Sequence, residues 1–353
     1  MKILITGVGG PTPRSFALSL KKFGSKYQDA KLIATDNNPL SIGLYQNDLF
    51  EKSYLVPGCN EIDYWDKMKA IINENEIDFA VVLPELEVIE WSNYIQNNDL
   101  PCKVFSPNYE LACSLVDKAK LTELLLPLDL TPLSFEFERN FDQLEDIFTK
   151  LGDEFWVRSS KGTSGLGSLK ITNLDSLKNW IQINTEVTTF LASKFLVGRN
   201  LACKLLYWNR QLVRAASGER VNYIMSKIAP SGITGNTSFG RLLNEEKLVK
   251  VASEAMAFLF KQMNIEPHGF FTVDLKEDEN GIPFITEINV RHVAFTQCFA
   301  AAGANFPEDT IRLLNNDITF DKSYKMYEFE KDLIFLRDVD AMPILMKEHE
   351  LLK

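Results

Sequence analysis

The first 112 residues alternate short apolar runs with longer stretches in which apolar residues recur every three or four positions. Short apolar runs are typical of buried β-strands, and the longer spacing indicates amphipathic helices. Strands that alternate with helices predict a parallel α/β sheet. The predicted strands are Lys2–Thr6, Lys31–Thr35, Lys52–Val56, Phe79–Leu83 and Lys103–Phe105. The predicted helices are Arg14–Phe23, Ile62–Asn73 and Leu86–Gln96.

The pattern changes near Leu111, where the regular alternation stops. Ser114–Leu126 predicts a helix rich in Lys, Leu and Glu, which ends where prolines follow. Phe135–Gly152 predicts another short helix, and Glu245–Met263 predicts a long amphipathic one. The remaining predicted strands are Phe155–Arg158, Leu169–Ile171, Thr189–Leu196, Leu201–Tyr207, Gly269–Lys276, Ile282–Val290 and the run Asp332–Leu336.

Alternate positions near the end of the strand Ile282–Val290 carry polar side chains. Successive strand residues point to opposite faces, so we expect Glu287, Asn289 and Arg291 to share one face. A carboxylate, an amide oxygen and a guanidinium in one row suit Mg²⁺ shared with phosphate oxygens, and the arginine can neutralise a transferring phosphoryl group. An exposed polar face on an edge strand is the alternative. The residues expected to face the core are Phe284, Thr286, Ile288 and Val290.

A second carboxylate favours the metal interpretation. Asp274 lies on the preceding predicted strand, and a hairpin through the polar turn Glu277–Gly281 can place it beside Glu287. Two adjacent acids that face the same space repel each other unless they share a cation or a proton. The pair therefore indicates a metal site rather than an edge strand.

Two glycine-rich segments could hold phosphate. Ser159–Ser168 joins two predicted strands, and its small residues allow backbone N–H groups to close over phosphate oxygens. It is not a Walker loop, and a solvent-exposed hairpin is the alternative. The first turn, Gly7–Pro11, and the later Asp36 partly match a nicotinamide-dinucleotide fingerprint, although the spacing departs from Gly-x-Gly-x-x-Gly. A tight turn is the alternative, so an oxidoreductase is a minority interpretation.

Composition limits the class of protein. A chain of 353 residues is long enough for two or three domains, and 45% hydrophobic and 24% charged residues are typical of soluble globular proteins. No apolar run approaches the ~20 residues of a membrane span, and the N-terminal run is too short for a signal peptide. Five scattered cysteines without metal-ligand spacing predict reduced thiols and a cytoplasmic location. The formal charge of −10 argues against a nucleic-acid surface, so an anionic ligand needs a local cluster of cations.

The order of these motifs resembles the ATP-grasp superfamily, specifically its carbamoyl-phosphate-synthase-like and biotin-carboxylase-like branch, over about residues 1–315. The likeness is in the combination of motifs, each of which is weak alone. The matching segments are Asp117-Lys118 at a helix start, Arg158 before a glycine-rich loop, Lys161–Ser168 in that loop, Ser193–Leu196 in a hinge to adenine, Asp274 on one strand, Glu287, Asn289 and Arg291 on the next, and Ala301–Pro307 in the helical segment after it.

The resemblance implies a role for each of these residues. Arg291 would be catalytic and would stabilise the transferring phosphoryl group or a later tetrahedral oxyanion. The metal ligands would be Asp274, Glu287 and Asn289. The ATP-binding residues would be Lys118, Arg158, Lys161, Gly162, Thr163, Ser164, Gly165, Ser193, Lys194, Phe195, Leu196 and Asn200.

The resemblance also implies an architecture of combined α/β and α+β parts. A Rossmann-like pre-ATP-grasp domain (1–112) would precede a two-lobed ATP-grasp fold. The small lobe (113–192) would carry the glycine-rich loop, and the large lobe (193–320) would carry the metal site. Residues 321–353 would form a C-terminal extension.

Three positions depart from the family pattern. Val290 replaces the usual proline, on the face expected to be buried. Asn200 stands where a ribose-binding glutamate is common, and Lys204 stands where aspartate or glutamate is usual. Whether these two changes alter ribose recognition is open.

The implied function is an ATP- and Mg²⁺-dependent ligase, with Mn²⁺ as the alternative ion. It would activate a small-molecule carboxylate as an acyl phosphate for attack by an amine or similar nucleophile, and it would release ADP and phosphate. The alternatives are a carboxyphosphate- or carbamoyl-phosphate-type enzyme and a non-catalytic ATP-binding protein. A homodimer is an open expectation, whereas nucleic acid and membrane are not expected partners.

The acceptor site is expected between the hinge and the metal strands. Surplus cations there favour an anionic substrate such as an amino acid or another carboxylate, with solvated surface charge as the alternative for each residue. His292 alternates to the buried side of Arg291 and is expected to be structural. The predicted acceptor residues are Arg214, Glu219, Arg220, Asn222, Lys227, Asn236, Ser238 and Arg241.

Overall fold

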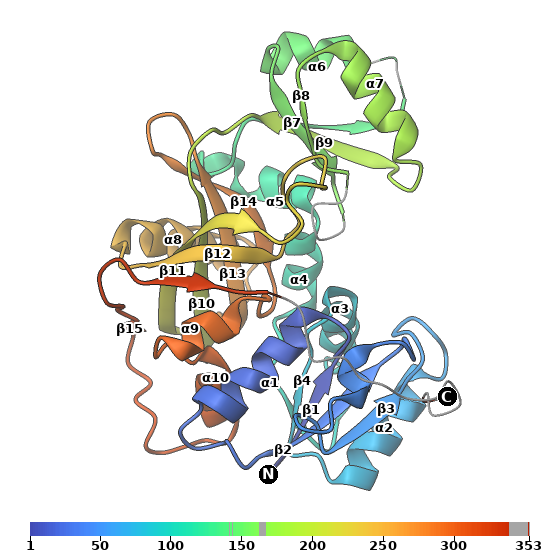
Figure 1. The fold of residues 1–353 in the computed structure, drawn as a ribbon, viewed down its shortest axis with the longest axis vertical. Helices are drawn as coiled ribbons and strands as arrows, with labels where there is room; N and C mark the ends of the chain where they lie inside the picture. Colours follow the sequence, from blue (N-terminus) through green and yellow to red (C-terminus); the bar gives the residue numbers. More distant parts are fainter. Residues whose placement is uncertain (141, 143, 162–166, 339–351, 353) are drawn as a thin grey trace.

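The N-terminal part of the molecule is a five-stranded, all-parallel sheet with the strand order β3-β2-β1-β4-β5. The predicted parallel α/β sheet is therefore present in the computed structural model (Figure 1). The structure describes residues 1–140, 142, 144–161, 167–338 and 352. The strands are β1 (Lys2–Thr6), β2 (Lys31–Asp36), β3 (Lys52–Leu55), β4 (Phe79–Val81) and β5 (Lys103–Val104), and the helices between them are α1 (Pro11–Phe23), η1 (Ile42–Tyr45), α2 (Tyr64–Asn75) and α3 (Glu85–Tyr94).

Alternate side chains of β1 enter two different cores, because successive strand residues face opposite sides of a sheet. Ile3 packs with Phe16 of α1 on one face. Leu4 packs on the other face with Met68 of α2 and Trp91 of α3. Helices therefore cover both faces of the parallel sheet, as expected when its strands are buried on both sides.

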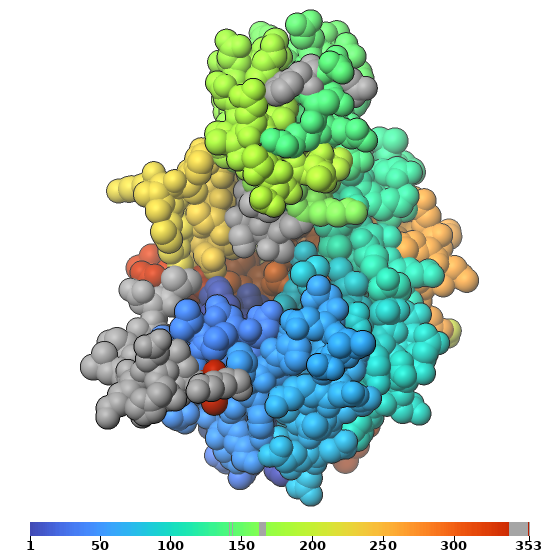
Figure 2. All heavy atoms as spheres, turned by 90° about the vertical axis from the view of Figure 1, so that its right-hand side faces the viewer, coloured from blue at the N-terminus to red at the C-terminus, as the bar shows by residue number. Residues whose placement is uncertain are grey.

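A four-stranded antiparallel sheet forms a separate small lobe with the order β6-β9-β7-β8. Two helices cover one face of this sheet, with Leu144 and Leu177 packed against Phe155 and Phe190. Figure 2 shows the small lobe as the upper end of the molecule. Its elements are β6 (Ser134–Glu138), α6 (Leu144–Leu151), β7 (Phe155–Ser159), β8 (Leu169–Ile171), α7 (Leu174–Ile183) and β9 (Thr189–Lys194).

A seven-stranded sheet forms the body of the molecule, with the order β14-β13-β10-β11-β12-β16 and with β15 beside β11. Its strands are β10 (Asn200–Trp208), β11 (Gln211–Tyr223), β12 (Thr237–Leu243), β13 (Gly269–Glu277), β14 (Pro283–Asn289), β15 (Lys325–Met326) and β16 (Ile334–Leu336). The helices packed on it are α4 (Tyr109–Val116), α5 (Lys118–Leu125), which continues into η2 (Leu126–Leu128), α8 (Glu246–Gln262), α9 (Thr296–Ala301) and α10 (Phe306–Leu314).

The parallel sheet and the large sheet are joined through α1, which lies beside α9 and α10 (Figure 1). The Glu308 carboxylate at the start of α10 accepts hydrogen bonds from the Ser25 and Lys26 backbone N–H groups, at 2.9 and 2.6 Å. Gln297 N donates to Ser15 Oγ at 2.8 Å. These contacts hold the turn after β1 close to the end of β14.

Two predicted helices differ from the structure. Ser114–Leu126 is two helices, because Asp117 adopts an extended conformation between them and its carboxylate accepts a hydrogen bond from Lys120 N at 3.1 Å. An aspartate in this position caps the helix that follows it. The first part of Phe135–Gly152 is the strand β6, in which Phe135 and Phe137 alternate with polar residues.

Other parts of the chain carry structure that the sequence patterns did not predict. The helix α7 and the long strands β11 and β12 are the largest of these. The segment Arg214–Arg241, expected to line the acceptor site, consists mainly of β11 and β12 and the loop between them. Within the described ranges, no helix is both long and apolar enough to span a membrane.

Candidate functional site

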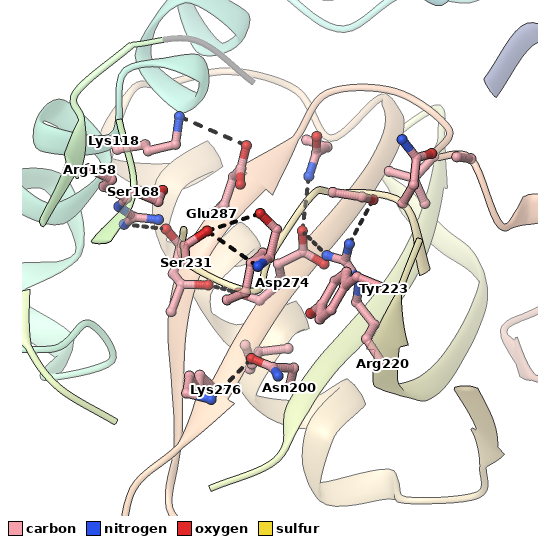
Figure 3. A pocket seen from close by; sticks show the side chains of 18 of the residues that line it. Lys118, Arg158, Ser168, Asn200, Arg220, Tyr223, Ser231, Asp274, Lys276 and Glu287 are labelled. Carbon is pink, nitrogen blue, oxygen red and sulfur yellow. Dashed lines mark hydrogen bonds and ion pairs between the residues drawn. The ribbon is translucent and has the colours of Figure 1, made fainter. Parts of the chain in front are cut away.

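A cavity of about 530 Å³ lies where the small lobe, the large sheet and the N-terminal turns meet. We call it the central cavity. It is lined by the β9 segment that leads into β10, by the first turn of the chain and by the loop between β11 and β12. Figure 3 shows charged side chains converging on the middle of the cavity from both lobes.

A β-bulge in β14 sets the direction of its polar side chains. Asp274 pairs with Glu287, but the next residue of β13, Leu275, pairs with Ile285, so Thr286 is an extra residue. An extra residue interrupts the alternation of side chains. Thr286 therefore lines the cavity together with Glu287 and Asn289, and the expectation that it faces the core is wrong. Phe284, also expected in the core, is only partly buried, whereas Ile288 and Val290 are buried as expected.

The carboxylate of Asp274 has one satisfied and one unsatisfied oxygen. Its Oδ2 accepts hydrogen bonds from Arg220 Nη1 at 3.1 Å and from Asn289 Nδ2 at 3.3 Å. Its Oδ1 is buried and has no hydrogen-bond partner among the described residues. Burial raises the pKa of Asp274, and Glu287 raises it further against the opposing effect of Arg220. A buried carboxylate oxygen without a partner, beside a second carboxylate, fits a bound cation.

The protein ligands available to such a cation are two carboxylates and one amide. Within the part of the chain that the structure describes, no three His, Cys, Asp or Glu side chains converge on one point. Magnesium is commonly held by one or two carboxylates, with waters and substrate phosphates as its other ligands. Asp274, Glu287 and Asn289 therefore fit magnesium better than a metal that requires a complete protein cage.

Three cations surround these carboxylates. Lys118 Nζ lies 3.9 Å from Glu287 Oε1. Arg158 donates from Nη2 to the Thr286 carbonyl at 2.7 Å, and Arg291 donates from Nη1 to the His292 carbonyl at 3.0 Å. The Nε atoms of Arg158 and Arg291 are buried without a hydrogen-bond partner among the described residues. The arrangement can neutralise several phosphate oxygens at once.

Another part of the cavity has a flat aromatic wall. The rings of Trp156 and Phe195 are stacked with centroids 6.3 Å apart, and Lys170 Nζ lies 4.4 Å from the Phe195 ring centre. Asn200 Oδ1 accepts a hydrogen bond from Lys276 Nζ at 3.1 Å. The oxygen of Asn200, the residue that stands where a glutamate is common, is therefore already hydrogen-bonded to Lys276.

Most residues predicted for the site line this cavity: Lys118, Arg158, Ser193, Lys194, Phe195, Leu196, Asn200, Asp274, Glu287, Asn289 and Arg291. Lys161 does not, and its Nζ lies 3.3 Å from Asp117 Oδ2. Gly162, Thr163, Ser164 and Gly165 lie outside the described residues.

Of the eight residues predicted to line the acceptor site, only Arg220 and Asn236 line the cavity. Arg214 is buried and donates to the Asp321 carbonyl at 2.6 Å. Arg241 pairs with Glu219 at 2.8 Å. Arg214 and Arg241 bind neighbouring segments of the chain. Their number therefore gives no information about the charge of the substrate.

Two further expectations concern side chains behind the site. Lys204 does not line the cavity; it is fully buried, and its Nζ donates to Thr296 Oγ1 at 3.1 Å. Its replacement of an acid therefore bears on packing and not on ribose recognition. His292 is buried with its ring stacked on Phe270 at 3.7 Å, which agrees with a structural role.

The glycine-rich first turn is explained by packing. A side chain on Gly7, whose φ is +67°, would approach Pro84 Cγ to 2.1 Å. Asp36 accepts hydrogen bonds from Gly9 N at 2.7 Å and Ser41 Oγ at 2.8 Å. Both Asp36 oxygens are thus engaged within the chain, which favours the tight-turn interpretation over a ribose-binding acid.

Several residues near the site were missed in the sequence. Trp156, Lys276 and Phe295 line the cavity. Glu85 begins α3, and burial raises the pKa of its carboxyl group, with Arg291 and Lys118 opposing and Glu287 adding to the effect. Its position just beyond a parallel strand was the available signal, because ligands bind at the carboxyl ends of such strands.

The comparisons with known proteins bear on this geometry. No family model and no curated sequence matches the chain. Among solved structures, N5-carboxyaminoimidazole synthetase from Staphylococcus aureus in complex with ADP has a TM-score of 0.69 at 16% identity, covering 95% of this chain and 79% of that one. An L-amino acid ligase from Bacillus licheniformis has a TM-score of 0.63 at 16% identity, covering 89% and 74%.

A third similar structure is the biotin carboxylase domain dimer of Hydrogenobacter thermophilus 2-oxoglutarate carboxylase, in complex with MgADP, ADP and bicarbonate. It has a TM-score of 0.66 at 13% identity and covers 91% of this chain and 71% of that one. Identities this low establish a shared fold and nothing finer. The chain has the ATP-grasp fold of these ligases.

Proposed function

We propose that this protein is an ATP- and Mg²⁺-dependent ligase that activates a carboxylate as an acyl phosphate for attack by an amine. The observation that carries this proposal is the unsatisfied Asp274 Oδ1, beside Glu287 and within a ring of buried cations. The same cavity has the aromatic wall of Trp156 and Phe195, on which a purine could stack. Phosphoryl transfer depends mainly on positioning and on stabilising charge, and this arrangement can supply both.

Asp274, Glu287 and Asn289 would hold the magnesium ion. When bound, the ion would supply positive charge to the β- and γ-phosphates. The hinge Ser193–Leu196 would present backbone groups to adenine. Lys118 and Arg158 would bind phosphate oxygens and position the γ-phosphate in line with the incoming carboxylate.

The first chemical step transfers the γ-phosphoryl group. A carboxylate oxygen of the substrate attacks the γ-phosphorus, the bond to the β-bridging oxygen breaks, and ADP leaves. Arg291, next to the metal strands, would stabilise charge on the transferring group. An acyl phosphate hydrolyses in water, so its formation in a closed cavity protects it.

In the second step the amine nitrogen attacks the acyl carbon, and phosphate leaves. The nitrogen loses a proton as the bond forms, and the leaving phosphate, which is itself a base, can carry that proton away.

The finer architecture belongs to the same proposal. Residues 1–112 would be the Rossmann-like pre-ATP-grasp domain, and residues 113–192 and 193–320 would be the small and large lobes. Residues 321–353 would be an extension, of which β16 adds a strand to the large sheet. A homodimer and a cytoplasmic location stay predictions.

The decisive experiment measures ADP release with ATP, Mg²⁺ and a panel of carboxylates and amines. We expect ADP release that requires both a carboxylate and an amine, and a product with the mass of their condensed pair. Glu287→Gln should lower kcat at least ~100-fold, since it removes a metal ligand beside the transferring group. Glu254→Gln, an exposed change on α8, is the matched control and should leave kcat unchanged.

Three outcomes would replace this proposal or part of it. Full ADP release by Glu287→Gln would show that the metal site is assigned wrongly. Thermal stabilisation by ATP without ADP release under any substrate combination would indicate a nucleotide-binding protein, which the occupied Asn200 Oδ1 favours as the second candidate. ATP hydrolysis that needs only bicarbonate would indicate carboxyphosphate chemistry, as in the carboxylases of the same fold.

A further inference from the structure

Part of the central cavity has apolar walls. We call this the acceptor chamber and define it by Pro11, Pro13, Leu83, Tyr223, Ile233 and Phe295, all of which line the cavity. The residues come from four parts of the chain: the start of α1, the turn after β4, the end of β11 with its following loop, and the residue before α9.

Hydrogen bonds connect the segments around Phe295 and Ile233 to neighbouring elements. Phe295 precedes α9, and α9 contacts α1 through the bond from Gln297 N to Ser15 Oγ at 2.8 Å. The loop after β11 is held by Arg220, whose Nη2 donates to the Gly235 carbonyl at 2.8 Å. These two bonds hold Phe295 near α1 and hold the loop that carries Ile233 near Arg220.

Arg220 lies at the boundary between the chamber and the metal residues (Figure 3). Its guanidinium is 4.9 Å from the Tyr223 ring centre and 5.4 Å from the Phe295 ring centre. Its Nη1 donates to Asp274 Oδ2 at 3.1 Å. Each terminal nitrogen of arginine carries two N–H groups, so Nη1 and Nη2 each keep one donor beyond these bonds.

None of the six residues that define the chamber is acidic. Among the described residues that line the central cavity, the acidic ones are Asp274 and Glu287, which belong to the metal site. Arg220 and Arg291 face the same region as these acids. The chamber thus offers two guanidinium groups next to the metal residues and apolar side chains beyond them.

We propose that the carboxylate substrate is a monocarboxylic acid with an apolar body. Its carboxylate would lie between Arg220 and Arg291, and its body would contact Tyr223, Ile233 and Phe295. This identification of the substrate class rests on the proposed ligase function, while Arg220 as the second carboxylate-binding cation rests on the geometry alone.

Other substrate classes fit the chamber less well. A dicarboxylate would place its second charge among apolar side chains, which is costly without a partner. A body with a positive charge would be repelled by the two arginines. Bicarbonate would leave the apolar walls uncovered, so they would give no affinity.

Equilibrium binding tests the proposal without any turnover. The protein is saturated with Mg²⁺ and a non-hydrolysable ATP analogue, and hexanoate, octanoate, phenylacetate, glutarate, hexanamide and hexylamine are titrated by calorimetry. We expect the affinity for linear monocarboxylates to rise by about fourfold per methylene until the chamber is filled. Glutarate, hexanamide and hexylamine should bind at least about tenfold more weakly than hexanoate, since each lacks a match to the head or the walls.

Different variants test the carboxylate-binding arginine and the apolar walls of the chamber. Arg220→Met, measured under saturation with the ATP analogue, should weaken all monocarboxylates by about tenfold or more but leave hexanamide within about twofold, because the amide does not depend on the guanidinium charge. If that variant does not fold, Ile233→Asp tests the same chamber from a surface loop, because a carboxylate there should repel the substrate. Ile228→Asp, on the same loop but exposed and outside the cavity lining, is the matched control and should bind hexanoate normally.

The outcomes distinguish this proposal from the ligase function. Chain-length-dependent binding that Ile233→Asp removes supports the chamber even if no amine is ever condensed. Tightest binding of glutarate or of hexylamine, or equal binding of hexanoate and hexanamide, overturns it. So does ADP release with dicarboxylates only, although that result would leave the ligase function intact.

Discussion

Lys204 is a cation enclosed by aromatic rings in the large lobe. Its Nζ lies 4.7 Å from the Phe295 ring centre and 4.9 Å from that of Phe299, and its side chain is fully buried. Burial lowers the pKa of the ammonium group to about 7, from an ordinary value of 10.5. Contact with the rings and with Thr296 offsets only part of the cost of burial.

This pKa predicts a pH dependence of stability. Between pH 7 and about 10 the unfolded chain binds one proton more than the folded protein at this site, so the free energy of unfolding should rise with pH by about 1.4 kcal/mol per unit. Below pH 7 both states are protonated and the contribution is constant. Lys204→Met should abolish this rise, measured as the difference from wild type in urea unfolding at several pH values. Lys250→Met, an exposed change on α8, should keep it, and equal slopes in Lys204→Met and wild type would refute the argument.

Single residues of the site were predictable where a simple alternation holds. Asp274, Glu287 and Asn289 could be brought together from the sequence because hairpin strands pair and their side chains alternate. Thr286 could not, because nothing in its local pattern signals the bulge. The sequence relates Lys204 to ribose recognition, because a sequence alone does not show on which face of the sheet a single charged side chain is buried.

At the scale of elements, the break between α4 and α5 positions Lys118. The Asp117 carboxylate accepts from Lys120 N at 3.1 Å, and Lys118 N donates to the Ser160 carbonyl at 2.9 Å. The cap therefore sets the start of α5 next to the strand that carries Arg158. A helix cap depends only on residues that are neighbours in the sequence. The Asp117-Lys118 motif could therefore be recognised even though the predicted helix Ser114–Leu126 included it.

Removing this cap should weaken both the helix and the site. Asp117→Ala is expected to lower the free energy of unfolding by about 1 kcal/mol and to raise the KM for ATP, since Lys118 follows the cap directly. Asp117→Asn keeps an acceptor of similar capping strength and should stay near wild type in urea unfolding. An unchanged KM in a destabilised Asp117→Ala protein would mean that the cap stabilises the helix without placing Lys118.

The elements that the sequence did not reveal are those whose pattern is set by distant partners. The β11 strand is buried along most of its length, yet its sequence includes Arg214, Glu219 and Arg220, so it shows neither a continuous apolar run nor a regular alternation. Partners far along the chain satisfy these charges, such as the Asp321 carbonyl for Arg214. The parallel sheet was easier, because each of its strands is bounded by a turn and followed by a helix in the sequence itself.

At the scale of the whole molecule, the acceptor chamber exists only while the N-terminal sheet is docked on the large lobe. Pro11 and Leu83 come from the former, and Phe295 comes from the latter. The Glu308 carboxylate is buried in this junction and accepts from the Ser25 and Lys26 backbone N–H groups. The hinge and the aromatic wall belong to β7 and to the segment from β9 to β10, whereas the junction lies between α1, α9 and α10.

Glu308→Ala should therefore weaken the binding of the carboxylate while it leaves the binding of ATP nearly unchanged. The N–H groups of Ser25 and Lys26 would lose a charged acceptor, at a cost of about 1 kcal/mol each, because both residues are exposed and water can partly replace it. We expect a lower Tm and a KM for the carboxylate that rises several-fold, whereas the affinity for a non-hydrolysable ATP analogue stays within about twofold, because only one wall of the chamber is displaced. Glu254→Ala on the exposed face of α8 is the control for loss of a charge. Equal losses of ATP and carboxylate affinity would show that the junction supports the entire cavity, and the chamber would then not be a separable part of the molecule.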